Sequence, residues 1–455
     1  MSDGGDRAAV KPRERDSIIQ ALRAGVVPRV GLRHVQVGRA REVEQVVADV
    51  ERVAAGGAAI RVVVGDYGSG KTFFLNLVRS VALQRSLVSV HADLSPDRRV
   101  HSSGGHARAL YAELMRNMAT RSKPEGGALA NVVERFLGDA KAAAAAAGIP
   151  VEAAIRDRLS PVQELVSGYD FATVVSLYCR GFDGGDETLK SCALRWLRGE
   201  YSLKTEARDA LGVRSIIDDA TAYDYIKVMA VFCKMAGYGG FLVVLDEMVN
   251  LFKLVNAQAR NANYEQVLRI VNDVLQGTAG PMMFYMGGTP EFLADPRRGL
   301  YSYEALRSRL AENAFARNGL VDLSGPVIRL QNLTPEELYI LLGNLRSVFS
   351  DGGGHGPPLP DGALVAFMAH CDAKVGASYF RTPRNTIKAF LDLLAVMEQN
   401  PGTGWENLVG QVDVAPDAGP AAGDIHDEPA PPAPARTDAV APPSGRMDDL
   451  ASFRV

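Results

Sequence analysis

Residues 65–72, GDYGSGKT, combine three glycines, a lysine and a threonine in an arrangement that binds phosphate groups. The spacing fits G-x-x-x-x-G-K-[ST], and the stretch follows the apolar run IRVVV, as that motif requires. Glycines lack a β-carbon, so backbone N–H groups can converge on one concavity, to which the next helix adds its positive end. We expect the lysine to reach the β- and γ-phosphates of a nucleotide and the threonine hydroxyl to bind Mg²⁺. The expected binding residues are Gly65, Asp66, Tyr67, Gly68, Ser69, Gly70, Lys71, Thr72 and Phe73.

A second carboxylate site for the metal is expected where an apolar strand ends in acid. Residues 241–247, FLVVLDE, supply this pattern. Asp246 is placed to hold Mg²⁺ through water, together with Thr72, and Glu247 to orient or deprotonate the attacking water. The alternative is a strand that ends in two solvated acids. Because the nucleophile in phosphoryl transfer must be aligned with the leaving group, the acidic pair favours hydrolysis over simple nucleotide binding.

These residues are positioned by the strands and helices around them. In the sequence, short β-branched or apolar runs alternate with helical patterns. The strands are expected near 60–65, 87–94, 241–247, 281–288 and 327–333, and they predict a parallel α/β sheet flanked by helices. The run GGALANVVERFLGDAKAAAAAAGIP predicts a helix that stops at Gly148 and Pro150. TPEEL at 334–338 predicts a helix start, with Thr334 as cap and Glu337 completing a capping box.

The predicted organisation has five parts. They are a flexible lead (1–15), an N-terminal helical segment (16–57), an α/β core (58–330) with a helical insertion at about 120–236, a small all-α unit (331–400) and a disordered Pro/Ala-rich tail (411–455). The tail's composition cannot bury enough apolar surface to fold. Met447, Leu450 and Phe453 near its end are spaced three apart, which fits a short docking helix or chance.

Composition excludes some classes of protein. A formal net charge of −3 over 455 residues argues for neither a nucleic-acid coat nor a membrane-surface protein. The four cysteines form no CxxC pair and fit free thiols in a reducing compartment. No apolar run is long enough for a membrane helix, so we expect a cytoplasmic protein without membrane contact.

GDYGSGKT, FLVVLDE and the helical unit after the last strand resemble the AAA+ ATPases over about residues 37–400. The resemblance implies ATP and Mg²⁺ as cofactors, an AAA+ P-loop NTPase fold, and a lid formed by the helical unit. VGRAREVE (37–44) resembles the segment that borders the adenine base, which adds Val37, Gly38 and Arg39 to the expected site.

The same resemblance implies three further catalytic residues. Thr289, after PMMFYMGG, falls where the class places a sensor of the γ-phosphate. Arg384 in RTPRNTIKAF matches the lid sensor. Arg309 in ALRSRL resembles the arginine of clamp loaders and initiators that reaches into a neighbouring subunit's nucleotide, which implies a homo-oligomer. Arg307 and Arg298 are alternatives for that finger. A guanidinium suits both arginine roles, because its fork matches phosphate oxygens.

A narrower resemblance rests on ALRAGVVPRVGLRHVQVGR, GDYGSGKTFFL and GGTPEFL. Over most of residues 16–400 the chain is similar to the ATP-binding proteins of BREX-type phage-defence systems. This implies a bacterial ATPase that works on or near DNA within a multi-protein assembly, with partners of the helicase or methyltransferase type. The function expected from it is remodelling, loading or regulation of a DNA-associated partner.

Two alternatives stay open. One is a nucleotide-gated scaffold or signalling switch with slow hydrolysis; the other is an Orc/Cdc6-like DNA-binding initiator, disfavoured because no winged-helix domain is evident after the helical unit. DNA contact is therefore expected to be mainly non-specific. Arg98, Arg99, Arg297 and Arg298 are candidates for meeting phosphates or are solvated loop charges. His91, His101 and His106 lack metal-type spacing and are expected to be loop or surface residues.

Overall fold

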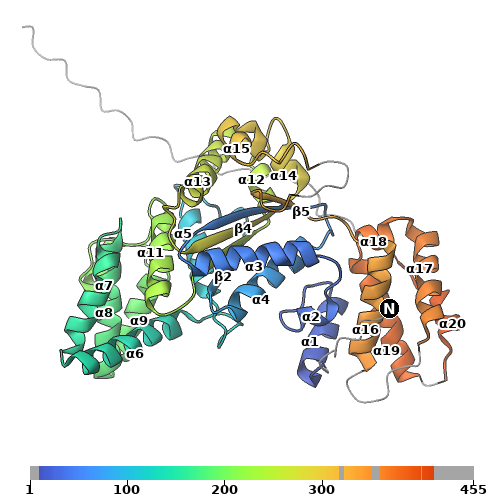
Figure 1. The fold of residues 1–455 in the computed structure, drawn as a ribbon, viewed down its shortest axis with the longest axis horizontal. Coiled ribbons are helices and arrows are strands. Elements are labelled where there is room, and N and C mark those ends of the chain that lie inside the picture. Colours follow the sequence, from blue (N-terminus) through green and yellow to red (C-terminus); the bar gives the residue numbers. More distant parts are fainter. Residues whose placement is uncertain (1–9, 317–321, 351–358, 401, 415–455) are drawn as a thin grey trace, which may run out of the picture.

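The computed structural model describes residues 10–316, 322–350, 359–400 and 402–414 (Figure 1). Its centre is one sheet of five strands in the order β2-β3-β4-β1-β5, in which every pair of neighbours is parallel. The strands are β1 (Ala59–Val64), β2 (Val88–Asp93), β3 (Phe241–Asp246), β4 (Met282–Gly288) and β5 (Val327–Arg329). The predicted parallel α/β sheet is confirmed.

The last strand is shorter than predicted. β5 ends at Arg329 because the residues after it turn toward the glycine-rich loop. The N–H group of Leu330 donates to the carbonyl oxygen of Val64 at 2.7 Å, and the side chain of Asn332 donates to Asp66 at 3.2 Å. The segment therefore leaves the sheet to border the nucleotide motif.

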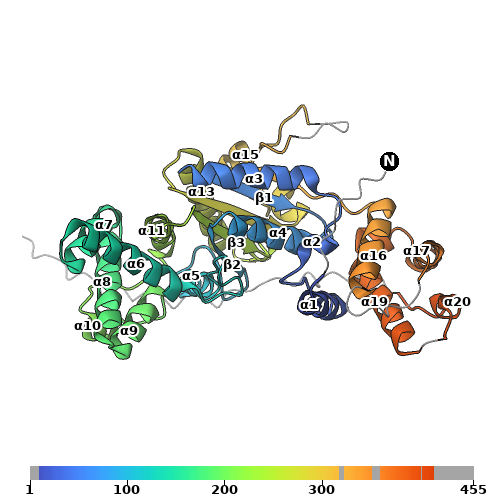
Figure 2. The same ribbon diagram turned by 60° about the horizontal axis from the view of Figure 1, so that its bottom comes forward.

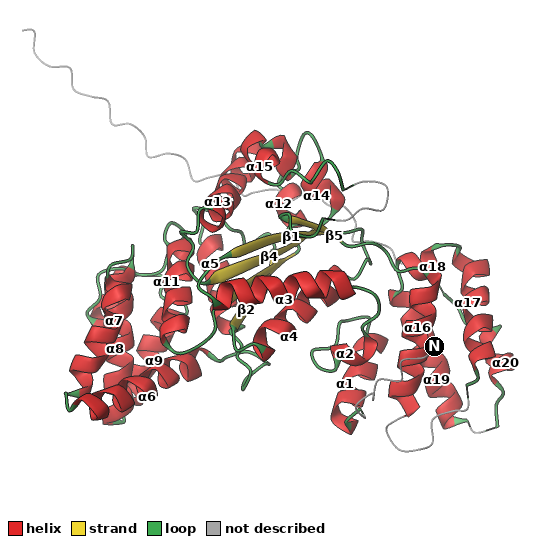
Figure 3. Ribbon diagram, viewed as in Figure 1, coloured by secondary structure: helices red, strands yellow, loops and turns green. Residues whose placement is uncertain are grey.

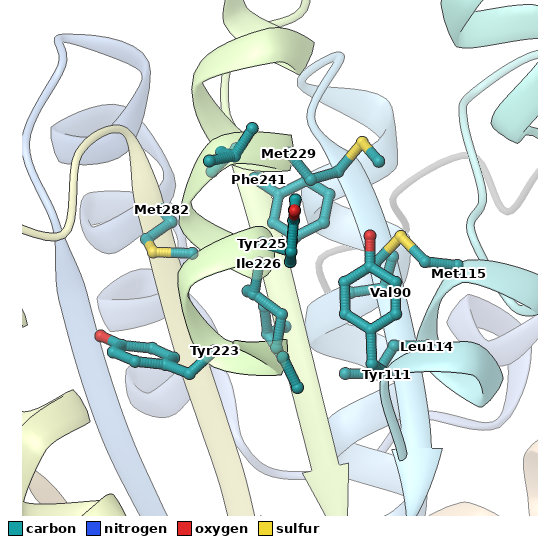
Figure 4. Close-up of a cluster of buried hydrophobic side chains, with 14 of the residues drawn as sticks. Val90, Tyr111, Leu114, Met115, Tyr223, Tyr225, Ile226, Met229, Phe241 and Met282 are labelled. Atoms are coloured by element: carbon teal, nitrogen blue, oxygen red, sulfur yellow. The ribbon is translucent and has the colours of Figure 1, made fainter. Parts of the chain in front are cut away.

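Alternate residues of strand β1, which lies between β4 and β5, enter two different hydrophobic cores. Ile60, Val62 and Val64 pack on the face covered by α5 (His106–Arg116), α11 (Ala222–Met235) and α13 (Ala257–Leu275). Figure 4 shows this face, where aromatic and methionine side chains of α5 and α11 lie against β2, β3 and β4. Ala59 and Val63 pack on the other face, against α3 (Ala40–Ala54) and α4 (Lys71–Gln84). Burial of both faces explains why the strands read as continuous apolar runs.

A buried ion pair fixes α3 to the sheet. Arg61 of β1 and Asp49 of α3 lie 2.6 Å apart, and both side chains are almost completely buried. The Tyr285 hydroxyl donates to the same carboxylate at 2.8 Å. Loss of one partner would leave an uncompensated buried charge, so this contact holds α3, and the segment before it, in one place.

The region between β2 and β3 is helical, as Figure 3 shows. Besides α5 and α11 it contains α6 (Leu129–Ala147), α7 (Val151–Gln163), α8 (Gly168–Gly184), α9 (Glu187–Leu197) and α10 (Lys204–Leu211). The alanine-rich helix α6 ends as expected at Gly148, whose φ of 65° is left-handed. Four short helices follow β3 and β4: α12 (Val249–Phe252), α14 (Pro290–Ala294), η1 (Leu300–Ser302) and α15 (Glu304–Arg309).

The helices after β5 form a second core, which we call the C-terminal bundle. It consists of α16 (Pro335–Ser350), α17 (Asp361–Val375), α18 (Ser378–Arg381), α19 (Arg384–Gln399) and α20 (Trp405–Val409). The predicted capping box at the start of α16 is present: Glu337 N–H donates to Thr334 Oγ1 at 3.2 Å, and Thr334 N–H donates to the Glu337 carboxylate at 3.0 Å.

The N-terminal helices divide between the two cores. α1 (Pro12–Arg23) and α2 (Leu32–Val35) pack with the C-terminal bundle, whereas α3 packs on the sheet. Figure 2 shows α1 and α2 between α4 and the helices α16 and α19. α1 begins four residues earlier than the predicted segment, because Pro12 has the φ angle that a first helical residue requires.

The second core also extends beyond the predicted end of the all-α unit. α20 follows it, and Val414 is buried against the bundle, so the first residues of the predicted tail are packed. The proposed docking residues Met447, Leu450 and Phe453 lie outside the described residues.

Candidate nucleotide-binding site

The glycine-rich loop connects β1 to α4 with two residues in the left-handed region. Gly68 has a φ of 80° and Gly70 a φ of 86°, conformations that side chains with a β-carbon rarely adopt. The Lys71 ammonium donates to the carbonyl oxygens of Gly65 and Asp66 at 2.9 and 2.8 Å. Ser69 Oγ is buried without a hydrogen-bond partner among the described residues. A concave loop with a lysine folded over it and an unsatisfied hydroxyl fits the phosphates of a nucleotide.

The acidic end of β3 meets this loop. Thr72 Oγ1 donates to Asp246 Oδ2 at 2.8 Å, although the two residues are 174 positions apart. The other oxygen of Asp246 accepts from the Glu247 N–H group at 2.8 Å. Glu247 itself has a φ of 56°, and such backbone strain concentrates at functional sites. A hydroxyl and a carboxylate in contact form an oxygen donor set suited to Mg²⁺.

The charged groups at this edge perturb one another's protonation. Partial desolvation raises the pKa of Glu247, and the neighbouring carboxylates of Asp246 and Asp93 raise it further. Desolvation lowers the pKa of Lys71, while Asp246 and Glu247 act in the opposite direction. Titratable groups with such perturbed pKa values are typical of functional sites.

A pocket of about 210 Å³ opens beside the loop. Lys71, Thr72 and Glu247 are among its polar lining residues. Its apolar lining comes from distant parts of the sequence and includes Leu22, Val26, Val27, Phe73, Leu341 and Ile387. A lining of charged and apolar side chains together suits a ligand with a charged tail and a flat apolar ring, which is the shape of a nucleotide.

The segment before α3, which was expected to border the adenine base, lies partly at this pocket. Val37 and Arg39 line it. Arg39 also donates to the carbonyl oxygen of Ser69 at 3.3 Å and to that of Gln331, so its guanidinium ties the loop to the segment after β5. Gly38 lies instead against Glu337: a β-carbon there would be 2.4 Å from the carboxylate.

The C-terminal bundle touches the loop at two points. Arg384 lines the pocket, and its Nη1 donates to the Tyr67 hydroxyl at 3.0 Å, with the guanidinium 5.5 Å from the ring centre. A β-carbon on Gly68 would lie 2.9 Å from the Thr382 methyl group. The glycine is therefore needed for close approach of the bundle, as well as for its own left-handed backbone.

The structure does not bring Thr289 and Arg309 into the pocket. Thr289 follows β4 and caps α14, accepting from the Phe292 N–H group at 3.4 Å. Arg309 is exposed on α15 and donates to the Asn272 side chain and to the Ala305 carbonyl oxygen. Of the alternatives, Arg307 is also exposed, and Arg298 donates to the Leu254 carbonyl oxygen at 3.2 Å. None of the three arginines lines the pocket.

One acidic residue at the site was not among the predictions. Asp93 ends β2 and lies opposite Asp246 in the strand register. Partial desolvation and the Asp246 carboxylate raise its pKa. Its position was readable from the sequence, since the acid in LVSVHADL follows an expected parallel strand and the carboxyl ends of such strands share one edge of the sheet.

Two expectations for basic and histidine residues need correction. His91 was expected at a loop or the surface, but it lies within β2 and is partly buried, and burial lowers its pKa to about 3. Arg99 is buried, with Nε donating to the Pro96 carbonyl oxygen at 2.9 Å, so it is not a solvated loop charge. Arg98 lies 3.5 Å from Glu113 in an ion pair.

Comparison with known proteins identifies one family. The profile described as "BREX system ATP-binding protein BrxC/D" matches residues 10–413. No curated protein matches the chain. Within the described part of the chain, every helix is too short or too polar to cross a membrane, and no group of three or more histidine, cysteine or acidic side chains is arranged to hold a metal ion.

Proposed function

The chain belongs to the family of BREX system ATP-binding proteins BrxC/D, and from this premise we propose that it is an AAA+ ATPase that hydrolyses ATP with Mg²⁺. Family membership points to an ATP-binding role in a phage-defence system and to a multi-protein assembly. We further propose that the chain hydrolyses ATP, that it uses Mg²⁺, and that it uses the energy of hydrolysis to act on a partner.

The contact between Thr72 and Asp246 carries the proposal. It joins the phosphate-binding loop to the acidic end of β3 and so forms one site from two distant stretches of sequence. These two residues would hold Mg²⁺, which when bound neutralises charge on the phosphate oxygens. Lys71 would turn from the loop carbonyls to the β- and γ-phosphates, exchanging neutral acceptors for charged ones.

Glu247 is the group that would handle the attacking water. It lines the pocket beside Asp246, and its raised pKa brings it closer to the range in which a carboxylate accepts a proton efficiently. Because the backbone of Glu247 is left-handed, the direction of its side chain is not set by the alternation of side chains along β3. Arg384, already in the pocket, would stabilise the phosphates from the side of the C-terminal bundle, which would then act as the lid.

Replacement of Glu247 by glutamine tests this assignment. The Glu247→Gln chain is expected to bind ATP but to release phosphate about 10²- to 10⁴-fold more slowly, which is the range for losing a general base. Glu152→Gln, at an exposed glutamate of α7, is the matched control and is expected to keep the wild-type rate. An unchanged rate in the Glu247 variant would remove this residue from the mechanism.

A homo-oligomer follows from the proposed role of Arg309. This side chain is exposed and lies outside its own chain's pocket, so it needs a neighbouring subunit to reach a nucleotide. Sizing the protein with and without a non-hydrolysable ATP analogue tests the idea: a larger species with the analogue supports it. Arg309→Ala is then expected to reduce turnover in the assembled species, and a monomer under both conditions would exclude the finger.

The proposed output is remodelling, loading or regulation of a DNA-associated partner, with mainly non-specific DNA contact. Exposed arginines such as Arg297 support only a salt-dependent association with phosphates. Phosphate release measured with and without DNA, together with gel-shift assays at several salt concentrations, tests this output. Binding that distinguishes one sequence from another would favour the initiator alternative.

A nucleotide-gated switch is the second candidate, and the contacts between the bundle and the loop favour it. Arg384 donates a hydrogen bond to Tyr67, and Thr382 lies close to Gly68. These two contacts make the position of the bundle sensitive to what the loop binds. A switch would turn over slowly with or without DNA, but would change its proteolysis pattern or assembly state when ATP binds. Rapid DNA-stimulated turnover would reject this candidate.

A further inference from the structure

A second pocket, which we call the arginine pocket, is bordered by the segment between α1 and α3, which also borders the nucleotide pocket. Its volume is about 270 Å³. It is lined by Glu14 of α1, residues 29–33, the side of α4 from Asn76 to Gln84, His91 of β2 and residues in the turn 121–125. None of these residues lines the nucleotide pocket, so the two sites are distinct.

The charge of this pocket is strongly unbalanced. Four arginines line it, Arg29, Arg33, Arg79 and Arg121, against two glutamates. One glutamate is already engaged, since Glu14 lies 3.4 Å from Arg33. Within the described part of the chain, no carboxylate forms an ion pair with any of the other three arginines. Four guanidinium groups that line one pocket with only two carboxylates repel one another, so the arrangement gains stability when an anion binds.

The innermost groups are also short of partners. Arg79 donates from Nη1 to Asn76 Oδ1 at 2.8 Å, but its Nε is buried and has no partner among the described residues. The same is true of Nδ1 of His91. Burial and the nearby Arg29 lower the pKa of Arg79 to about 10, and burial with Arg79 and Arg29 keeps His91 neutral. Buried polar groups in proteins are normally satisfied, so these atoms call for a ligand or bridging water.

We propose that the arginine pocket binds a phosphate group that is not part of the ATP site's nucleotide. A phosphate has enough oxygens to accept from several guanidinium forks at once, which a single carboxylate has not. The arginines come from the segment 29–33, α4 and the turn 121–125, so the anion would join three parts of the molecule. A free small anion and the terminal phosphate of a nucleic-acid strand share this chemistry.

The test measures the binding of pyrophosphate to the full-length chain that carries Lys71→Ala. This replacement suppresses binding of pyrophosphate at the glycine-rich loop. Calorimetry is expected to detect pyrophosphate binding in this background. Arg29→Ala combined with Arg121→Ala is expected to weaken it by about tenfold for each arginine removed. Both side chains are exposed, so the replacements leave the cores intact.

A double control separates the site from general surface charge. Arg156→Ala with Arg208→Ala removes two exposed arginines of the helical insertion and is expected to leave pyrophosphate affinity unchanged. If pyrophosphate does not bind the Lys71→Ala chain at millimolar concentration, or binds equally well to both double variants, the proposal is overturned. Because ATP takes no part, failure here leaves the proposed ATPase activity untouched.

A second pair of probes identifies the source of the phosphate. A short single-stranded oligonucleotide with a 5′-phosphate is compared with the same strand carrying a 5′-hydroxyl. Tighter binding of the phosphorylated strand, lost in the Arg29/Arg121 variant, assigns the site to a nucleic-acid end. Equal binding of the two strands alongside arginine-dependent pyrophosphate binding assigns it to a free anion.

Discussion

The nucleotide pocket and the arginine pocket share two walls but balance their positive charge differently. Both are bordered by the segment between α1 and α3 and by α4. In the nucleotide pocket, Lys71 is held by carbonyl oxygens and lies near the acids Asp246 and Glu247. In the arginine pocket, Arg79 donates to the amide oxygen of Asn76, and no carboxylate among the described residues pairs with it. Mixed charges suit a triphosphate with its divalent cation, whereas a site with four arginines and two glutamates suits an anion that arrives without a metal.

The two pockets also use α4 differently. The nucleotide pocket lies at the first turn, where unpaired N–H groups and the helix dipole attract negative charge. The arginine pocket lies along the side of the helix, from Asn76 onward, where the dipole contributes little. Its attraction for anions must therefore come from side chains.

Removal of the loop lysine should have the largest effect and should be confined to one pocket. The Lys71→Ala chain is expected to bind ATP about 100-fold more weakly, because charge-assisted hydrogen bonds to the phosphates are lost. Fluorescence titration with a labelled ATP analogue measures this. Lys374→Ala, at an exposed lysine of α17, is the control and is expected to bind normally. Equal affinity in the two variants would contradict the assignment of the loop.

Replacement of Arg384 should have an intermediate effect on ATP affinity. It tests whether the C-terminal bundle contributes to the nucleotide pocket. Arg384→Ala is expected to lower ATP affinity about tenfold, since one charged donor is removed from the pocket. Tyr67→Phe removes only the hydroxyl that accepts from Arg384 at 3.0 Å and is expected to change ATP affinity much less. If the two variants behave alike, the arginine serves to hold the loop rather than to contact the nucleotide.

Those parts of the site that lie close together along the chain were predictable from the sequence. The loop follows β1 directly, and the apolar run before Asp246 is long enough to be recognised as a strand. The contact between Thr72 and Asp246 could also be predicted from the sequence, because parallel strands bring their carboxyl ends to one edge of the sheet. The capping box needed only residues 334–337.

The apolar half of the pocket was not predictable, because helical periodicity shows which face of a helix is buried but not against what. α1 packs against α19, which lies more than 300 positions later in the sequence; Arg23 and Asp392 meet there at 2.9 Å. Val26, Leu341 and Ile387 come together only through this packing. The arginine pocket was missed for the same reason: Arg29, Arg79 and Arg121 are far apart in the sequence and line one pocket only in the fold.

The smallest expected effect concerns Asn76, which lies between the two pockets on α4. Its Oδ1 accepts from Arg79, and its Nδ2 donates to the Thr72 carbonyl oxygen at 3.0 Å. One amide thus orients the innermost group of the arginine pocket and braces the residue expected to bind the metal. The hydrogen bond to Thr72 is neutral, and such bonds contribute about 1 kcal/mol, so Asn76→Ala is expected to weaken ATP binding by about fivefold.

The same replacement, made in the Lys71→Ala background, is expected to weaken pyrophosphate binding by a similar factor, because Arg79 loses the amide oxygen to which it donates. Asn407→Ala, at an exposed amide of α20 that lines neither pocket, is the control for both titrations. A change in one affinity without the other would show that the pockets are energetically separate despite their shared helix. Parallel changes would show that this one amide supports both pockets.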